Sequence, residues 1–402
     1  MINIKNPVVR GSIILLILFA AFNAFNFLYH IFMARNLSIE DYGALKTLFF
    51  FLYIGGILME SLQTVVTKYS STQKDKGNLK WLFTNYVKKL TPVILVLFLI
   101  YVFSSIFLSP LLKINKTILI FNGLFFLGAI FSPVARGILQ GQKRFFSLGF
   151  SFLSESILKL ITALILVNLG FGLFGAVSGA ILAIFISIFI SLFFLRDILS
   201  ENQKPYLISG IKDYGFPVLI ATTSIIIFFN VDVFLARVFF SEQLNGLYSI
   251  ASTIALIIFL GTQPISKALF PVTAGEENNK KDRRRHLSKA ILLLSTCILF
   301  ALVIIKIFPD EIINLFSNKN LPEIKNIVFI LALGNSFLSL TNLVIFYKLS
   351  IGKTKGCFFL PVFIIIQIIL LYIFSDSLFS FSIAYLSASI IFLIGSLLAL
   401  RR

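Results

Sequence analysis

Long apolar runs separated by short polar segments recur along the whole chain. A helix needs about 20 apolar residues to cross the hydrocarbon core of a bilayer, so runs of this length are candidate membrane spans. The pattern predicts twelve spans, at residues 11–34, 43–67, 91–109, 117–139, 148–169, 174–195, 211–236, 246–270, 289–308, 325–348, 356–374 and 378–400. The expected fold class is therefore an all-α polytopic membrane protein.

The positively charged side chains provide an independent check on this topology. If the N-terminus is cytoplasmic, 26 of the 35 Lys and Arg residues fall in cytoplasmic segments, eight fall outside, and Lys159 lies within a span. Cytoplasmic loops carry an excess of Lys and Arg, and a missed span would have exchanged the two sides partway along the chain. The bias predicts a multi-pass protein of the cell (cytoplasmic) membrane with both termini in the cytoplasm.

Composition agrees with a membrane location and argues against nucleic-acid binding. The chain is 58% hydrophobic and 13% charged and contains 47 Phe residues, whereas soluble proteins carry about 25% charged residues. The net charge of +18 is distributed between apolar runs rather than over one folded basic face, so no nucleic-acid partner is expected. The densest basic stretch, residues 280–289, reads as a topology determinant or as a contact for anionic lipid head groups.

An internal repeat divides the chain into halves. Residues 34–43 read ARNLSIEDYG and residues 236–246 read ARVFFSEQLNG, and each segment lies between two apolar spans. An offset of 202 residues places Arg35 on Arg237, and after one inserted residue Gly43 falls on Gly246. A repeat of six spans keeps both copies in the same orientation. We therefore expect two parallel six-helix lobes, residues 1–200 and 201–402, around a central cavity.

Several of these segments carry a family resemblance. The stretch NVDVFLARVFFSEQLNGLYSIASTIALIIF, followed by ISKALFPV, resembles the seventh and eighth spans of Wzx-type polysaccharide flippases. RGILQGQKRF and FLSESILKLITALILVNLGFGLFGAVSGAIL resemble the region from the fourth to the sixth span of that family, and FNFLYHIFMARNLSIEDYGALKTLFF its first two spans. The family belongs to the multidrug/oligosaccharidyl-lipid/polysaccharide exporter superfamily.

The resemblance implies a substrate and a mechanism. Such flippases move a polyprenyl-diphosphate-linked oligosaccharide from the cytoplasmic to the outer leaflet by alternating access. It therefore implies a role in the biosynthesis of a surface polysaccharide or glycan. The expected partners are this lipid-linked oligosaccharide, membrane lipids and, as further candidates, other glycan-assembly membrane proteins. No cofactor is expected, and the two cysteines and two histidines show no metal-ligand spacing.

Four ionisable residues of the first half lie in the cytoplasmic half of the predicted spans. They are Glu60, Arg136, Glu155 and Lys159. Such groups are costly at membrane depth and are functional candidates by default. The spacing of Glu155 and Lys159 places both on one helix face, where they either lock the bundle as a neutral pair or contribute to substrate binding. In the second reading Lys159 and Arg136 attract the diphosphate, while Glu155 and Glu60 position them.

The repeat helps to choose between these readings. Aligning GFSFL at residue 149 with GCFFL at residue 356 places Glu155 on Val362 and Lys159 on Ile366. The second half thus builds the equivalent helix without the charged pair. This asymmetry favours a functional role over a packing role.

The remaining polar candidates lie in the first and seventh predicted spans. We expect Asn23 and Asn26 to face the cavity, and Asn230 and Asp232 to bind a sugar hydroxyl or a cation. Asp232 is also a candidate partner for Arg237. Arg35 and Arg237 mark the outer ends of these spans, where they either reach toward the interface or form part of an outer gate.

Three functions are compatible with these features. The leading hypothesis is a lipid-linked oligosaccharide flippase, because a polar glycan cannot cross hydrocarbon unaided. The alternative is a cation-coupled multidrug or small-molecule exporter of the same fold, although the acidic residue that such exporters carry in the first span is missing here. A membrane glycan polymerase or transferase is disfavoured, because no metal or nucleophile constellation stands out. The protein is therefore not expected to be an enzyme.

Overall fold

A computed structural model describes residues 7–205, 212–274, 280–352 and 355–399. Within these ranges every regular element is a helix, so the all-α prediction is confirmed. Four of the basic residues that support the predicted topology lie outside the described ranges: Lys5, Lys353, Arg401 and Arg402. The predicted span ends at residues 211 and 400 also lie outside them.

The helices group into two compact units. Unit 1 comprises Met1–Leu37 and Phe51–Ile211, and unit 2 comprises Ser38–Phe50 and Lys212–Arg402. The beginning of one long helix therefore packs with unit 2, although its remainder belongs to unit 1. Each predicted lobe, residues 1–200 or 201–402, is one continuous stretch of sequence. The two units differ from this division, because residues 38–50 belong to unit 2 although they lie within the sequence of unit 1.

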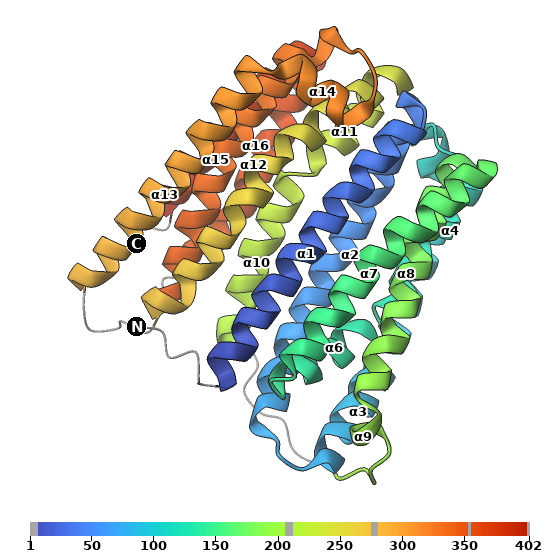
Figure 1. Ribbon diagram of the computed structural model, residues 1–402, viewed down its shortest axis with the longest axis vertical. Coiled ribbons are helices and arrows are strands. Elements are labelled where there is room, and N and C mark those ends of the chain that lie inside the picture. Colours follow the sequence, from blue (N-terminus) through green and yellow to red (C-terminus); the bar gives the residue numbers. More distant parts are fainter. Residues whose placement is uncertain (1–6, 206–211, 275–279, 353–354, 400–402) are drawn as a thin grey trace. The chain divides into compact units, whose positions relative to one another are not determined.

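Unit 1 is built from long helices and several short ones. Its elements are α1 (Pro7–Asn36), most of α2 (Ile39–Thr72), α3 (Lys76–Leu112), α4 (Lys116–Gly123), α5 (Phe125–Gly128), α6 (Ser132–Gly141), α7 (Phe145–Leu166), η1 (Val167–Phe171), α8 (Gly172–Phe194) and α9 (Arg196–Leu199). Helix α7 packs between α1 and α8 (Figure 1). This packing places polar residues of three helices within reach of one another.

Unit 2 has a second set of long helices. Its elements are the start of α2, then α10 (Lys212–Phe228), α11 (Val231–Phe239), α12 (Glu242–Ala274), α13 (Lys280–Ile307), α14 (Pro309–Ser317), η2 (Pro322–Ile324), α15 (Lys325–Ser350), η3 (Lys355–Phe359), α16 (Leu360–Ile373) and α17 (Leu378–Ala399). Helix α15 packs against α12, α13 and α17 (Figure 1). The basic stretch at residues 280–289 forms the first turns of α13 rather than a loop.

Ten helical stretches in the described residues are long and apolar enough to cross a membrane, or eleven if a bent pair forms one span. A multi-pass membrane protein is thereby confirmed, whereas the count of twelve stays a prediction. One of the ten stretches, Phe145–Phe194, contains both α7 and α8. The chain reverses between them at Gly170 and Gly172, whose positive φ angles of 91° and 46° suit glycine because it lacks a Cβ.

Contacts between α7 and α8 establish an antiparallel hairpin. Thr162 donates a hydrogen bond of 3.1 Å to the carbonyl of Gly179, and the hydroxyls of Ser151 and Ser191 lie 2.6 Å apart. Residue numbers rise along one helix as their partners' numbers fall along the other. A Cβ added at Gly179 would lie 2.5 Å from the Ala163 nitrogen, so this glycine permits close packing of the two backbones.

The repeated glycines meet within unit 2. A Cβ added at Gly43 of α2 would lie 2.9 Å from the Cα of Gly246 and 2.5 Å from the Oδ1 of Asn245 on α12. The starts of these two helices therefore cross at backbone contact. Gly43 and Gly246, which occupy equivalent positions in the sequence repeat, are thus in contact with each other.

Three ion pairs lie at the polar ends of the unit 1 helices. The guanidinium of Arg144 donates two hydrogen bonds of 2.7 Å to the carboxylate of Asp197, and Lys76 lies 3.0 Å from the same carboxylate. Hydrogen bonds from Arg144, together with Lys76, hold the pKa of Asp197 well below its usual range. Lys204 pairs with Asp75 at 2.7 Å and lowers the pKa of that carboxyl as well.

Candidate functional site

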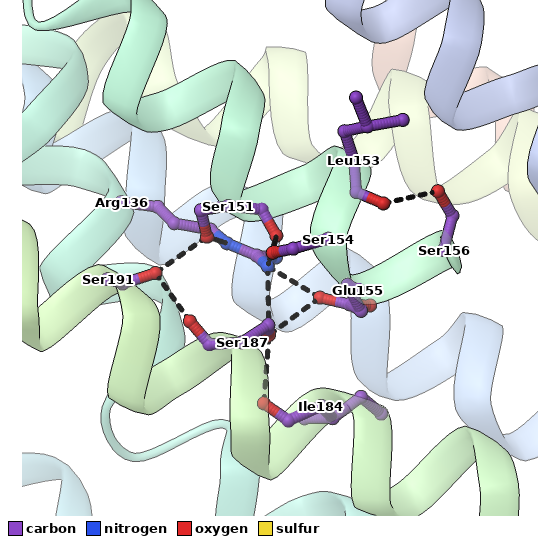
Figure 2. Close-up of polar contacts among 9 residues, drawn as sticks. All are labelled: Arg136, Ser151, Leu153, Ser154, Glu155, Ser156, Ile184, Ser187 and Ser191. Carbon is purple, nitrogen blue, oxygen red and sulfur yellow. Dashed lines mark hydrogen bonds and ion pairs between the residues drawn. The ribbon is translucent and has the colours of Figure 1, made fainter. Parts of the chain in front are cut away.

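Arg136 of α6 lies at the centre of a buried polar cluster in unit 1 (Figure 2). Its Nη2 donates to the Oε2 of Glu155 at 2.5 Å and to the hydroxyl of Ser187 at 3.2 Å. Its Nε donates to the hydroxyl of Ser151 at 3.1 Å, and its Cζ lies 4.0 Å from the centre of the Phe152 ring. The three helices α6, α7 and α8 are joined by this one guanidinium.

The serines complete the hydrogen bonding of this cluster. Ser187 donates to the same Glu155 oxygen at 3.1 Å, and Ser191 donates to the Ser187 carbonyl at 2.9 Å. Only 6% of Arg136 is exposed. A buried ion pair is tolerated where further hydrogen bonds satisfy both partners. The geometry of this cluster therefore suits a fixed structural pair.

Lys159 lies one helical turn from Glu155 on α7 and turns toward α1. Its ammonium donates a hydrogen bond to the Oδ1 of Asn26 and lies 4.5 Å from the centre of the Tyr29 ring. Tyr29 is itself held by a 3.0 Å hydrogen bond from its hydroxyl to the carbonyl of Ala176. The structure thus brings together Lys159 and Asn26, which the sequence separates by 133 residues.

Other predicted residues of unit 1 are more accessible. Asn23 on α1 and Glu60 on α2 are exposed, and Arg35 is exposed near the end of α1. The backbone carbonyl of Glu60 accepts a hydrogen bond from the Thr64 hydroxyl at 2.9 Å. Within the described part of the chain, the hydrogen bonds and the ion pair of the Arg136 cluster do not include Glu60 or Asn23.

Asp232 of unit 2 lies at the start of α11, where a membrane span is broken. Helices α10 and α11 form a pair bent by 40°. The carbonyl of Phe228 at the break accepts a 2.9 Å hydrogen bond from the Gln367 side chain, and Asn230 donates a 2.8 Å bond to the carbonyl of Ile226. Side chains thus satisfy backbone groups that a continuous helix would pair, as a membrane interior requires.

The carboxylate of Asp232 is almost fully buried. One of its oxygens, Oδ2, accepts a 2.8 Å hydrogen bond from the Tyr248 hydroxyl on α12. Lys46 of α2, only 4% exposed, interacts with Asp232 electrostatically. The polar residues at this break are therefore Asn230, Asp232, Tyr248 and Lys46, from three helices.

Arg237 is buried one turn and a half further along α11. Its Nη2 lies 3.0 Å from the Oε2 of Glu242, and only 1% of its side chain is exposed. The electrostatic partners of Arg237 also include Asp41 and Glu40 at the start of α2. The partner of Arg237 in this ion pair is thus Glu242, whereas Asp232 bonds to Tyr248.

Sequence reasoning missed Lys46, Tyr248 and the three serines Ser151, Ser187 and Ser191. Lys46 belongs to the start of α2 and was counted among the eight outer basic residues. The serines gave no signal of their own, since hydroxyl residues are common in apolar helices.

The fold and the buried charges define a class, the polytopic helical membrane protein with polar groups buried inside each unit. A family model described as "Polysaccharide biosynthesis protein" matches residues 32–326. The chain belongs to this family, which confirms the resemblance expected from sequence. A search of curated proteins finds no match.

Solved structures of transporters share the fold. The inward-facing conformation of a multidrug resistance MATE family transporter of the MOP superfamily matches with a TM-score of 0.76 and 17% identity, over 93% of each chain. The lipid II flippase MurJ, in an inward closed conformation, matches with a TM-score of 0.76 and 17% identity, over 97% of this chain and 88% of that one. These relatives are transporters and a flippase rather than enzymes.

An outward-facing structure of a MATE family transporter also matches. Its TM-score is 0.63 at 19% identity, over 98% of this chain and 94% of that one. At these identities the comparison establishes the fold, while the substrate rests on other arguments.

Proposed function

We propose that this protein flips a polyprenyl-diphosphate-linked oligosaccharide from the cytoplasmic to the outer leaflet of the cell membrane. The membership of residues 32–326 in a polysaccharide biosynthesis family carries the proposal. The fold adds support, because it is shared with a lipid II flippase. A membrane protein with this fold can serve polysaccharide assembly by moving the lipid-linked intermediate.

Lys159 is the group best suited to receive the diphosphate. It is half-buried, its ammonium contacts an amide oxygen and an aromatic face, and it interacts electrostatically with Glu155 one turn away. A phosphate oxygen is a stronger acceptor for an ammonium than a neutral amide is. The substrate can therefore displace Asn26 from Lys159, and Asn26 would then be available to a sugar hydroxyl.

Arg136 takes a different part in this proposal. Its guanidinium already binds Glu155, Ser151 and Ser187, so a diphosphate would have to break a saturated buried cluster. We assign Arg136 and Glu155 to positioning, because they fix α7 and with it the location of Lys159. Other residues remain candidates for contacts with the substrate as it crosses the membrane. They are exposed Glu60 and Asn23, together with Asn230, Asp232, Arg35 and Arg237.

A multidrug exporter is the competing function. Its fold is equally close, since the MATE transporter and the flippase match with the same TM-score. The family match favours the flippase, because its description refers to polysaccharide biosynthesis. An exporter of small cationic compounds would also gain nothing from an ammonium placed to bind an anion, as Lys159 is here.

Complementation of a strain that lacks this gene tests the proposal. Wild-type protein should restore surface glycan, and Lys159→Ala should abolish it at equal membrane abundance. Lys159→Arg should retain part of the activity, because it keeps the positive charge. Exposed Lys116→Ala serves as the matched control and should behave as wild type.

Two results would overturn different parts of this account. Normal glycan display in Lys159→Ala would remove the diphosphate role of Lys159. Loss of drug resistance, with glycan display unaffected by deletion of the gene, would replace the flippase with an exporter. Tags at each end of the chain would test the proposed cytoplasmic location of both termini.

A further inference from the structure

The densest basic stretch of the chain, residues 280–289, has no part in the proposed flipping step. It contains six Lys and Arg residues, against one acidic residue within it, Asp282, and two just before it, Glu276 and Glu277. These basic residues form the first turns of α13, which continues without a break to Ile307. The positive charges are therefore carried on the same helix as the apolar side chains that follow them.

Three of these cations lie on one face of α13. Lys281, Arg285 and Lys289 follow one another at a spacing of four residues, and all three are exposed. Residues four apart lie one above the other on a helix, so these cations form a row. At 1.5 Å for each residue, the row extends about 12 Å along the helix axis.

The same face of α13 is apolar from residue 292 onward. Leu292, Leu299 and Val303 continue the row at spacings of seven and four residues, and 69%, 63% and 53% of them are exposed. Only 17% of the apolar window of α13 is buried, compared with 67% for Pro322–Ser350, which contains α15. Exposed apolar side chains of a spanning helix contact acyl chains, so Lys289 lies where the acyl region meets the head groups.

The equivalent helix of unit 1 treats its basic start differently. Helices α3 and α13 carry the third predicted span of each half of the sequence. At the start of α3, the ammonium of Lys76 lies 3.0 Å from the carboxylate of Asp197 on α9. Within the ranges that the structure describes, none of the ion pairs includes Arg284, Arg285 or Lys289. These three cations of α13 can therefore bind an anion from outside the protein.

We propose that this face of α13 binds an anionic glycerophospholipid from the leaflet around the start of the helix, which is the cytoplasmic leaflet in the predicted topology. The phosphate lies against Arg285 and Lys289, with Arg284 beside them, and the acyl chains follow Leu292 and Leu299. Clusters of four to eight Lys and Arg residues directly outside a spanning helix are typical of anionic-lipid sites. The inference goes beyond the proposed flipping function and does not depend on it.

The arrangement of this face favours a lipid over a soluble anion. Guanidinium and ammonium groups both form charge-assisted hydrogen bonds to phosphate, and a soluble anion would need only those groups. On α13 the cations end where the lipid-facing side chains begin, along one row. A phospholipid matches both parts, because its phosphate and its acyl chains are joined in the same order. Charges that served only to orient the span would need no common face.

A lipid bound in this way would stabilise the start of α13. Like charges one turn apart on a helix repel each other, as Arg285 and Lys289 do, and a phosphate between them removes that repulsion. Helix α13 packs against α12 and α15 on its other side. The lipid would thus hold the edge of unit 2 at the depth of the head groups.

Quenching by brominated lipids tests this site on the full-length protein. The chain has one tryptophan, Trp81, so Trp81→Phe/Leu292→Trp places a single reporter next to the cations. Dibrominated phosphatidylglycerol should bind at this reporter more tightly than dibrominated phosphatidylcholine, by about fivefold for each cation that contacts the phosphate. Adding Arg284→Gln/Arg285→Gln/Lys289→Gln should bring the ratio of the two binding constants close to one.

Two further proteins separate this site from a general effect of charge. Arg285→Lys/Lys289→Arg, in the reporter protein, keeps both charges and should keep the preference for phosphatidylglycerol. Trp81→Phe/Phe189→Trp moves the reporter to a lipid-exposed position of α8, near the same predicted side of the membrane. The two lipids should quench that reporter equally.

Equal quenching by the two lipids at the Leu292 position, or a preference that survives removal of the three charges, would overturn the proposal. Loss of the preference when inorganic phosphate is added at constant ionic strength would assign the cations to a soluble anion instead. The protein with its cations intact gives a decisive result even if the triple variant does not fold. No lipid-linked oligosaccharide is present in these samples, so a failure of the proposed flipping function leaves the result unchanged.

Discussion

The two units hold buried charge in opposite ways. In unit 1 Arg136 is fixed by a carboxylate, two serine hydroxyls and an aromatic ring. In unit 2 Asp232 has one tyrosine donor, a lysine at a distance and an open oxygen. Both arrangements place ions inside apolar helices, where each unpaired charge is costly. The difference separates a charge whose hydrogen bonds join three helices from a buried charge with one side-chain donor.

Removal of Arg136 should have the largest effect on stability. Arg136→Ala removes the ion-pair partner of half-buried Glu155, and breaking a fully buried pair costs about 3–5 kcal/mol, which sets the upper limit here. Thermal unfolding in detergent should show a strongly lowered transition. The double variant Arg136→Met/Glu155→Leu should recover much of the loss, because an apolar pair of similar volume needs no desolvation.

The same measurement can contradict this assignment. If Arg136→Ala unfolds like wild type yet loses flipping activity, Arg136 contacts the substrate rather than positioning α7. The contrast between the two units would then rest on unit 2 alone.

Single hydrogen bonds should matter more in unit 2 than in unit 1. Tyr248→Phe removes the side-chain donor to Asp232, and a hydrogen bond to a charged group is worth about 1.5–3 kcal/mol. Ser187→Ala removes one of several partners of Arg136 and should cost about 0.5–1.5 kcal/mol, the ordinary value for a hydrogen bond. Unfolding measurements on the two variants give the loss of unfolding free energy for each. Equal losses would show that the polar groups around Arg136 and around Asp232 are equally constrained.

The smallest effect is expected at the polar end of unit 1. Arg144 and Lys76 hold the pKa of Asp197 below its usual range. Its ion pairs therefore contribute stability that is full above the unfolded-state pKa of about 3.9. That contribution is lost as the pH falls through the lower pKa of the folded state. Because Asp197 is partly exposed, the contribution is at most about 1 kcal/mol.

Unfolding of wild type and Asp197→Asn as a function of pH measures this term. The two curves should differ near neutral pH and converge in acid. A constant difference at all pH values would mean that the ion pairs do not contribute.

Much of the fold follows from sequence because long apolar runs have few alternatives in a bilayer. The hairpin of α7 and α8 was predictable from two long runs joined by GFGLF, whose glycines at 170 and 172 make the reversal. The interleaved start of α2 was not, because the sequence contains no boundary within a continuous helix. The break before α11 was also missed, since Gln367, which donates to the Phe228 carbonyl at the break, lies 139 residues later in an apolar helix.

The site residues, like the fold, were predictable from the sequence only in part. Charges inside spans were identifiable one at a time, because each is costly there. Their partners were not, since the pairing of Lys159 with Asn26 and of Arg136 with Glu155 depends on how α1, α6 and α7 pack. Lys46 escaped notice because the charge pattern placed it in an outer segment, whereas the structure buries it beside Asp232.

Reconstituted translocation tests the central claim most directly. Purified protein is placed in vesicles that contain a polyprenyl-diphosphate-linked oligosaccharide, and the glycan exposed on each face is measured with a membrane-impermeant lectin. Wild type should equilibrate the glycan between leaflets faster than empty vesicles, and Lys159→Ala should not. No transfer of the glycan by folded wild-type protein, together with uptake of a cationic drug in the same vesicles, would contradict the account.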